Sequence, residues 1–152
     1  YYEEKKDPKR LVDICCASCS LPILCPVAYV DGIPMVDGGV CDAIPIQRAI
    51  DDGYPKNVII LTRNKGYRKK EKDFWLPSFI YRKYPAIREQ LKLRYRRYNE
   101  VLNYIDELEA KGNALVIRPE KPMEVGRTES NQEKLTALYE EGYEIGKRFL
   151  SK

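Results

Sequence analysis

The sequence has 152 residues, of which 43% are hydrophobic and 33% are charged, and its formal net charge is +4. This balance is typical of a folded domain with a core and excludes a chain that is disordered throughout. Apolar runs stay well short of the roughly 18 residues that suggest a membrane span. Residues 1–10 are polar and charged, so we expect no signal peptide. Because the first residue is Tyr1 and not methionine, we expect a processed chain or part of a longer one.

Histidine is absent, and five cysteines are present. Without histidine, a Ser-His-Asp triad, a Cys-His pair or a histidine-ligated zinc site cannot be assembled within this chain. Four of the cysteines lie within residues 15–25 among apolar neighbours, which favours small buried side chains in a reducing cytoplasm. Cys16 and Cys19 form a C-x-x-C motif, but no second pair accompanies it. We therefore predict a cytoplasmic protein with neither a metal nor a cofactor.

The first third of the chain predicts one apolar element followed by a hairpin. Residues 11–21 form an apolar stretch that is compatible with a buried helix or a buried strand. Two short apolar runs, residues 27–30 and 33–36, flank Asp31-Gly32. Both residues of that pair tolerate a positive φ, so this pattern predicts a β-hairpin.

A helix and a strand are predicted next. The helix covers residues 45–52, with Pro45 in its first turn and Gly53 just past its end. Residues 57–62 are continuous and β-branched, which is typical of a strand buried on both faces. A helix followed by such a strand indicates the α/β class, a sheet flanked by helices.

The rest of the sequence is predominantly helical in its pattern. Residues 85–112 predict the longest helix, and residues 114–117 a short strand. Ser130 and Glu133 have the spacing of a capping box at the start of the last helix. The apolar stripe of the long helix consists of Ile87, Leu91, Tyr95, Tyr98, Leu102, Ile105 and Leu108. The inner face of the last helix is predicted to consist of Leu135, Leu138, Ile145 and Phe149.

The tripeptide Asp37-Gly38-Gly39 is the strongest candidate for a chemical site. It follows the predicted hairpin directly, at the kind of strand end where α/β folds place their chemistry. An aspartate there can act as the general base for a serine without any histidine, although the same tripeptide is also an ordinary turn. The G-x-S-x-G elbow that normally carries such a serine is absent. None of the five serines is flanked by the two glycines: Ser18, Ser20, Ser78, Ser130 and Ser151.

Several pieces around this turn resemble one protein family. They are the run at residues 17–22, the hairpin with its Asp-Gly-Gly, Ile44-Pro45, and the strand residues 58–61. Their order and spacing resemble the C-terminal half of a bacterial-type patatin-like phospholipase, over roughly residues 14–70. The later part is similar to the C-terminal extension of bacterial members.

The resemblance implies a three-layer α/β fold and hydrolysis of lipid acyl esters by a Ser-Asp dyad. It assigns the role of the base to Asp37, supported by Gly38 and Gly39. The family's serine elbow and glycine-rich oxyanion loop have no match here, and Ala43 stands where many members carry asparagine. We therefore expect a C-terminal portion that acts on a lipid ester or phospholipid within its parent and is inactive alone.

The resemblance also implies a division of the chain. We expect residues 1–72 to be the last part of the catalytic domain. Residues 73–152 would be a helical extension, with one short strand, packed on the same domain. A sheet left incomplete exposes strand edges, so we expect a dimer or pairing with the missing N-terminal half.

A basic stretch at residues 63–97 contains thirteen Lys or Arg and three Asp or Glu, with tyrosines interleaved. Three interpretations fit it: a solvated helix face, an anionic lipid surface, or nucleic acid. No nucleic-acid motif accompanies the charge, so nucleic acid is disfavoured. A non-catalytic basic binding module is the alternative function. The predicted contacts with a peripheral membrane surface are Arg63, Lys65, Arg68, Lys69 and Lys70.

Overall fold

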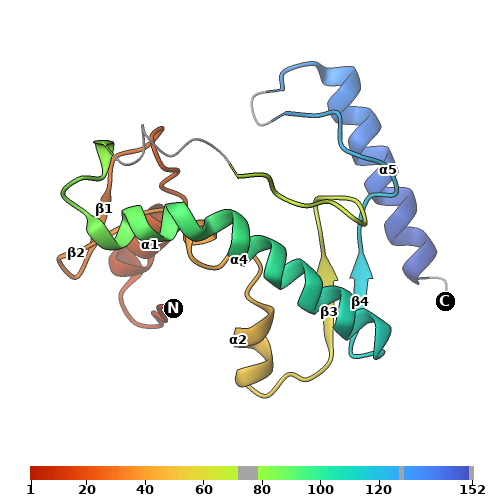
Figure 1. Ribbon diagram of the computed structural model, residues 1–152, viewed down its shortest axis with the longest axis horizontal. Coiled ribbons are helices and arrows are strands. Elements are labelled where there is room, and N and C mark those ends of the chain that lie inside the picture. The colour runs from red at the N-terminus through yellow and green to blue at the C-terminus, as the bar shows by residue number, and fades with distance from the viewer. Residues whose placement is uncertain (72–78, 127–128, 151–152) are drawn as a thin grey trace. The chain divides into compact units, whose positions relative to one another are not determined.

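The computed structural model describes residues 1–71, 79–126 and 129–150 (Figure 1). They form two compact units. Unit 1 comprises Tyr1–Pro45 and Lys69–Val101, and unit 2 comprises Ile46–Arg68 and Leu102–Lys152. Helices and small sheets together give a mixed α/β protein, in agreement with the predicted class. The predicted domain boundary at residues 72–73 lies outside the described residues and stays a prediction.

Unit 1 begins with a helix and a hairpin. Its elements are α1 (Pro8–Ser18), β1 (Ala28–Val30), β2 (Ile33–Met35) and the short 3-10 helix η1 (Gly38–Val40). Helix α1 packs against β1 and η1, and Ala17 is its one buried residue. Of the two alternatives predicted for residues 11–21, the structure thus has the helix.

The hairpin has the predicted turn. Strands β1 and β2 are antiparallel, with Ala28 opposite Met35. Asp31 has a φ of 52° and Gly32 a φ of 76°, as a two-residue turn with the twist of its strands requires. Arg10 of α1 donates to the Asp31 carboxylate at 2.8 Å, so an ion pair ties the turn to the helix.

The cysteine thiols are not buried as predicted. Helix α1 contacts the rest of unit 1 on one face, so side chains on its other faces reach solvent. Within the described residues, no group of His, Cys, Asp or Glu is arranged to hold a metal. All five thiols are free: Cys25 is half-buried, and the exposed ones are Cys15, Cys16, Cys19 and Cys41.

Unit 2 is built around a pair of parallel strands. Strands β3 (Asn57–Ile60) and β4 (Ala114–Ile117) lie side by side, with Asn57 opposite Ala114 (Figure 1). Helices α2 (Ile46–Asp51) and α5 (Gln132–Leu150) belong to the same unit, and α5 packs against β4. The buried core of this unit consists of Ile46, Ile59, Leu61, Leu102, Ile105, Leu108, Ala114, Val116 and Ile145.

Only one face of the β3–β4 sheet is covered, which corrects the prediction of a strand buried on both faces. Successive side chains of a strand point to opposite faces. Ile59 is buried, whereas Val58 and Ile60 are 65% and 74% exposed. Leu115 is exposed on β4 in the same alternation. The described elements therefore leave an apolar sheet face open.

The long helix α4 (Pro85–Ala110) contributes residues to both units. Its predicted stripe is confirmed, because all seven of these side chains are buried or half-buried. Gly112, with a φ of 71°, follows its end as predicted. No helix among the described residues is long and apolar enough to cross a membrane.

The start of helix α5 differs by one residue from the prediction. Asn131, not Ser130, is the N-cap, because its side-chain oxygen accepts a hydrogen bond from the Lys134 amide at 3.1 Å. On the predicted inner face, Ile145 is buried, but Leu135 is exposed.

Candidate active site around the Asp-Gly-Gly turn

The backbone of unit 1 holds Asp37 at the entrance to η1. Its amide donates to the Ser20 carbonyl at 2.8 Å, which ties it to the end of α1. Its side-chain Oδ1 accepts a hydrogen bond from the Gly39 amide at 2.8 Å, so Asp37 is the N-cap of the short helix. Among the described residues, none donates a hydrogen bond to the other oxygen, Oδ2. One carboxylate oxygen is therefore fixed while the other is available.

The two glycines of the turn differ in whether a side chain could be accommodated in their place. A Cβ on Gly39 would lie 2.9 Å from Asp37 Oδ1, so the carboxylate can approach this backbone closely only because no side chain intervenes. A Cβ on Gly38 would lie 3.5 Å from the Ser18 hydroxyl, an ordinary contact. Gly39 is thus the position that fixes the carboxylate.

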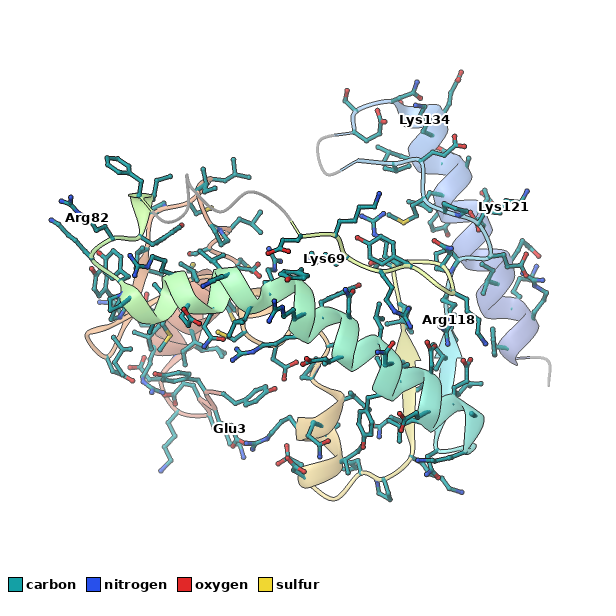
Figure 2. The ribbon with its side chains drawn as sticks, viewed as in Figure 1. Glu3, Lys69, Arg82, Arg118, Lys121 and Lys134 are labelled. Carbon is teal, nitrogen blue, oxygen red and sulfur yellow. The ribbon has the colours of Figure 1, made fainter. Side chains whose placement is uncertain are left out.

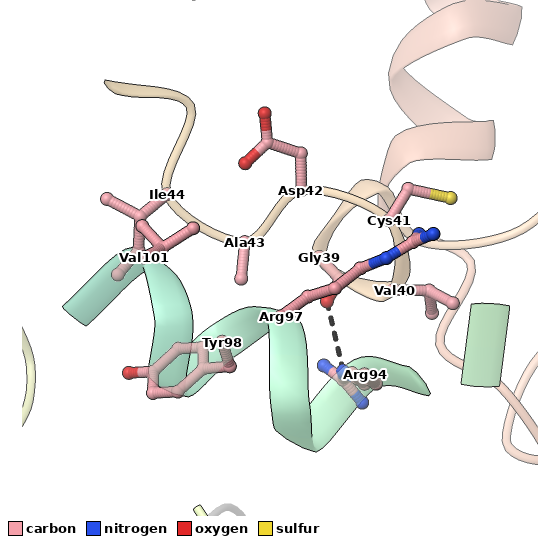
Figure 3. Close-up of a pocket in the computed structure, with 10 residues that line it drawn as sticks. All are labelled: Gly39, Val40, Cys41, Asp42, Ala43, Ile44, Arg94, Arg97, Tyr98 and Val101. Carbon is pink, nitrogen blue, oxygen red and sulfur yellow. Dashed lines mark hydrogen bonds between the residues drawn. The ribbon is translucent and has the colours of Figure 1, made fainter. Parts of the chain in front are cut away.

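Helix α4 holds the same turn from the other side. Arg94 Nε donates to the Gly39 carbonyl at 2.9 Å, the interaction marked in Figure 3. Gly39 therefore donates through its amide to Asp37 and accepts through its carbonyl from Arg94. The position of the Asp37 carboxylate therefore depends on Arg94, which lies 55 residues beyond Gly39 in the chain.

A second contact joins α4 to Lys69, the first residue of the second segment of unit 1. The Asn99 side-chain amide pairs with the Lys69 backbone in both directions, accepting from its N–H at 2.7 Å and donating to its carbonyl at 2.9 Å. The Lys69 ammonium lies 4.6 Å from the centre of the Tyr98 ring, a cation–π distance.

A small pocket lies between the turn and α4 (Figure 3). Its cavity volume of about 20 Å³ has room for one water molecule and not for an acyl chain. Ala43, the residue that departs from the family pattern, lines it. It is a gap in the packing beside Gly39. The other lining residues are Gly39, Val40, Cys41, Asp42, Ile44, Arg94, Arg97, Tyr98 and Val101.

The five predicted basic contacts divide between the units. Lys69 and Lys70 belong to unit 1, whereas Arg63, Lys65 and Arg68 belong to unit 2 (Figure 2 labels Lys69). Four of the five have partners within their own unit. Besides Lys69 on Tyr98, these contacts are Arg63 over the Tyr67 ring, Lys65 near Glu109, and Arg68 with Asp106. Of these four, Arg68 and Lys65 lie near carboxylates, whereas Arg63 and Lys69 lie over neutral tyrosine rings.

The sequence prediction missed Arg94. A long cationic side chain in a helix is normally assigned to the solvent side. Its spacing carried the signal, because Arg94 follows Leu91 by three residues and precedes Tyr98 by four, which places it on the inward stripe.

Two family models match the chain. Residues 1–50 match Patatin-like phospholipase. This segment includes the whole Asp-Gly-Gly turn, and the match supports a relation to that family of lipid hydrolases. Residues 84–152, which include the whole of α4, match a Domain of unknown function (DUF6363). No curated protein and no solved structure matches significantly.

The contact between Arg94 and Gly39 joins the two matched segments. Gly39 lies within the patatin-like match, and Arg94 lies within the match to the domain of unknown function. A hydrogen bond of 2.9 Å joins them inside one compact unit. The second matched segment thus takes part in shaping the candidate site of the first.

Proposed function

We propose that this chain is the C-terminal portion of a serine-dependent lipid acyl hydrolase and that Asp37 is the base of its Ser-Asp dyad. The observation that carries the proposal is the carboxylate of Asp37, anchored through Oδ1 and available at Oδ2, within the segment that matches patatin-like phospholipases. The serine and the oxyanion loop come from sequence outside these 152 residues, within the family's three-layer sheet.

The chemistry follows from the available carboxylate oxygen. Asp37 Oδ2 accepts the proton of the serine hydroxyl while the serine oxygen attacks the carbonyl carbon of a lipid ester. The tetrahedral intermediate collapses to an acyl-serine, and the departing alcohol takes the proton from Asp37. Water then attacks the acyl-serine, giving one proton to Asp37, and the serine recovers that proton as the fatty acid leaves.

The decisive experiment replaces Asp37 by asparagine in the full-length protein that contains the serine elbow. The asparagine side-chain oxygen still accepts from the Gly39 amide, so the turn keeps its cap, but the base is lost. We expect ester turnover to fall roughly 10²- to 10⁴-fold, with unchanged circular dichroism. The 152-residue chain alone should show no turnover.

Asp42→Asn is the matched control. Asp42 follows the same turn and accepts a hydrogen bond from the Tyr1 hydroxyl, but it has no role in the proposed dyad. It should retain turnover. Wild-type turnover in Asp37→Asn, or an equal loss in both variants, would contradict the assignment of the base.

The basic residues support a second, weaker proposal: peripheral contact of the parent with anionic phospholipid through Arg63, Lys65, Arg68, Lys69 and Lys70. Because four of the five have internal partners, we expect binding that is weak and salt-dependent. Co-sedimentation with anionic and neutral vesicles at two salt concentrations measures it. Equal binding to both vesicle types would contradict it.

A further inference from the structure

Unit 2 carries an alternating row of charges just beyond the carboxyl ends of β3 and β4. Arg118 directly follows β4 (Figure 2), and its side chain is only 11% exposed. It forms ion pairs with Asp106 at 3.1 Å and with Glu109. Arg68 pairs with Asp106 at 3.2 Å, and the Lys65 ammonium lies 3.7 Å from Glu109. Carboxyl ends of parallel strands are where α/β folds commonly bind ligands.

An open groove lies beside this row of charges. Its cavity volume of about 570 Å³ falls within the range of about 300–1,000 Å³ that is usual for small-molecule sites. Its apolar lining comes from β4, the residue after Arg118, and α5, and consists of Val116, Pro119, Ile145 and Phe149. Its charged lining consists of Lys65, Glu109, Arg118, Glu120 and Arg148.

The charges around the groove leave one cation in excess. Three cations and two carboxylates line it, and adding the pair Arg68–Asp106 does not change the balance. Arg148 pairs with Glu120 at 2.9 Å. Arg118 forms an ion pair with Glu109. The cation that is left in excess is therefore Lys65.

Lys65 is also the cation with spare donors. Its side chain is 75% exposed, and its distance of 3.7 Å from Glu109 exceeds that of a hydrogen bond. Within the described part of the chain, no group accepts a hydrogen bond from this ammonium. A ligand carboxylate can therefore bind there without breaking an existing hydrogen bond.

We infer that this groove binds a single-chain amphiphile with a carboxylate head, the class to which long-chain fatty acids belong. The carboxylate neutralises the one excess charge at Lys65. The apolar tail lies along Pro119 and Phe149, the half-buried apolar residues of the lining, and is removed from water there. A dianionic phosphate would overcompensate the charge, and a neutral tail would leave Lys65 without a counter-charge. This site belongs to unit 2 and does not depend on the proposed hydrolysis.

The test titrates the 152-residue chain with decanoate below its micellar concentration and follows the backbone amides by NMR. We expect saturable shifts at residues 65, 116 and 149. Decanol keeps the tail without the charge, acetate keeps the charge without the tail, and decyl phosphate carries the alternative head group. Each should bind more weakly than decanoate.

Lys65→Gln should weaken decanoate binding roughly 1.5- to fivefold, the range expected for one exposed charge pair. Lys111→Gln is the matched control, because Lys111 also lies 3.7 Å from a glutamate and is 65% exposed, but does not line the groove. It should bind like the wild type. Equal losses in both variants, equal binding of decanol, tighter binding of decyl phosphate, or no saturable shifts would overturn the inference. These outcomes are independent of ester turnover, which tests the proposed hydrolase separately.

Discussion

At the scale of single residues, Gly39 decides how the candidate base is held. Its amide and its carbonyl are both engaged, by Asp37 on one side and Arg94 on the other. The Asp-Gly-Gly motif and its place after a hairpin were predictable, because local turn chemistry depends on neighbouring residues only. The contact with Arg94 was not, since it joins residues 55 positions apart.

Arg94→Ala should destabilise unit 1 by about 1.5–3 kcal/mol, the usual value for a lost hydrogen bond to a charged group. In the proposed full-length hydrolase, the variant should also lower kcat more than it raises KM, because the Gly39 peptide that holds Asp37 loses its restraint. Thermal unfolding and steady-state kinetics measure the two effects.

Arg97→Ala is the control for this change. Arg97 lines the same pocket from the same helix, and no hydrogen bond between it and the turn is present among the described residues. We expect a change below about 0.5 kcal/mol. If the two variants behave alike, Arg94 has no special role in the turn.

At the scale of elements, patterns over a few residues predicted most of what is observed. Asp31-Gly32 predicted the hairpin, and apolar steps of three and four predicted α4. The start of α5 was misplaced by one residue because Ser130 and Asn131 are neighbouring residues that both cap well. The β-branched run of β3 predicted a strand, but it did not reveal that only one face would be covered.

The cap of α5 can be tested directly. Asn131→Ala removes the acceptor for the Lys134 amide and should destabilise unit 2 by about 1 kcal/mol. Ser130→Ala should leave stability nearly unchanged, because Ser130 lies one residue before the cap. Chemical unfolding followed by circular dichroism at 222 nm, a wavelength sensitive to helix, compares the two. A larger loss of stability in Ser130→Ala than in Asn131→Ala would show that Ser130 is the N-cap, as the capping box predicted from sequence.

At the scale of the whole molecule, the two compact units could not be predicted. Each combines segments distant in the chain, and the division depends on long-range contacts that no local pattern contains. The charge row of unit 2 is of the same kind. Lys65 and Arg68 were recognisable in the sequence as part of the basic stretch, but the acidic partner of Arg68 on α4, Asp106, lies 38 residues further along the chain.

This charge row gives the protein a pH dependence of predictable sign. Burial would raise the pKa of Asp106, but hydrogen bonds from Arg118 and Arg68 outweigh it and lower the pKa below the ordinary 3.8. Because the folded-state pKa is the lower one, the contribution to stability is complete above pH 3.8 and is lost as the pH falls through the folded value. We expect Asp106→Asn to lower the melting temperature of unit 2 at pH 7.

The difference in melting temperature between the wild type and Asp106→Asn should shrink as the pH falls below 3.8. Unit 2 amide resonances followed by NMR during heating report its unfolding separately from that of unit 1. Glu107→Gln provides the comparison, because Glu107 pairs with Lys111 on the exposed side of the same helix. A constant difference across pH would show that the charge of Asp106 does not stabilise the fold.

Among the described residues, β3 pairs with β4 along one edge only, and its other edge has a signature in isotope exchange. The amides of Asn57 and Leu61 donate to carbonyls of the β4 segment, so alternation directs the amides of Val58 and Ile60 away from it. In deuterated water, the outward amides should therefore lose their protons much sooner than the inward ones. A further strand docking along β3 would slow Val58 and Ile60 selectively, so their exchange rates report whether this sheet is complete.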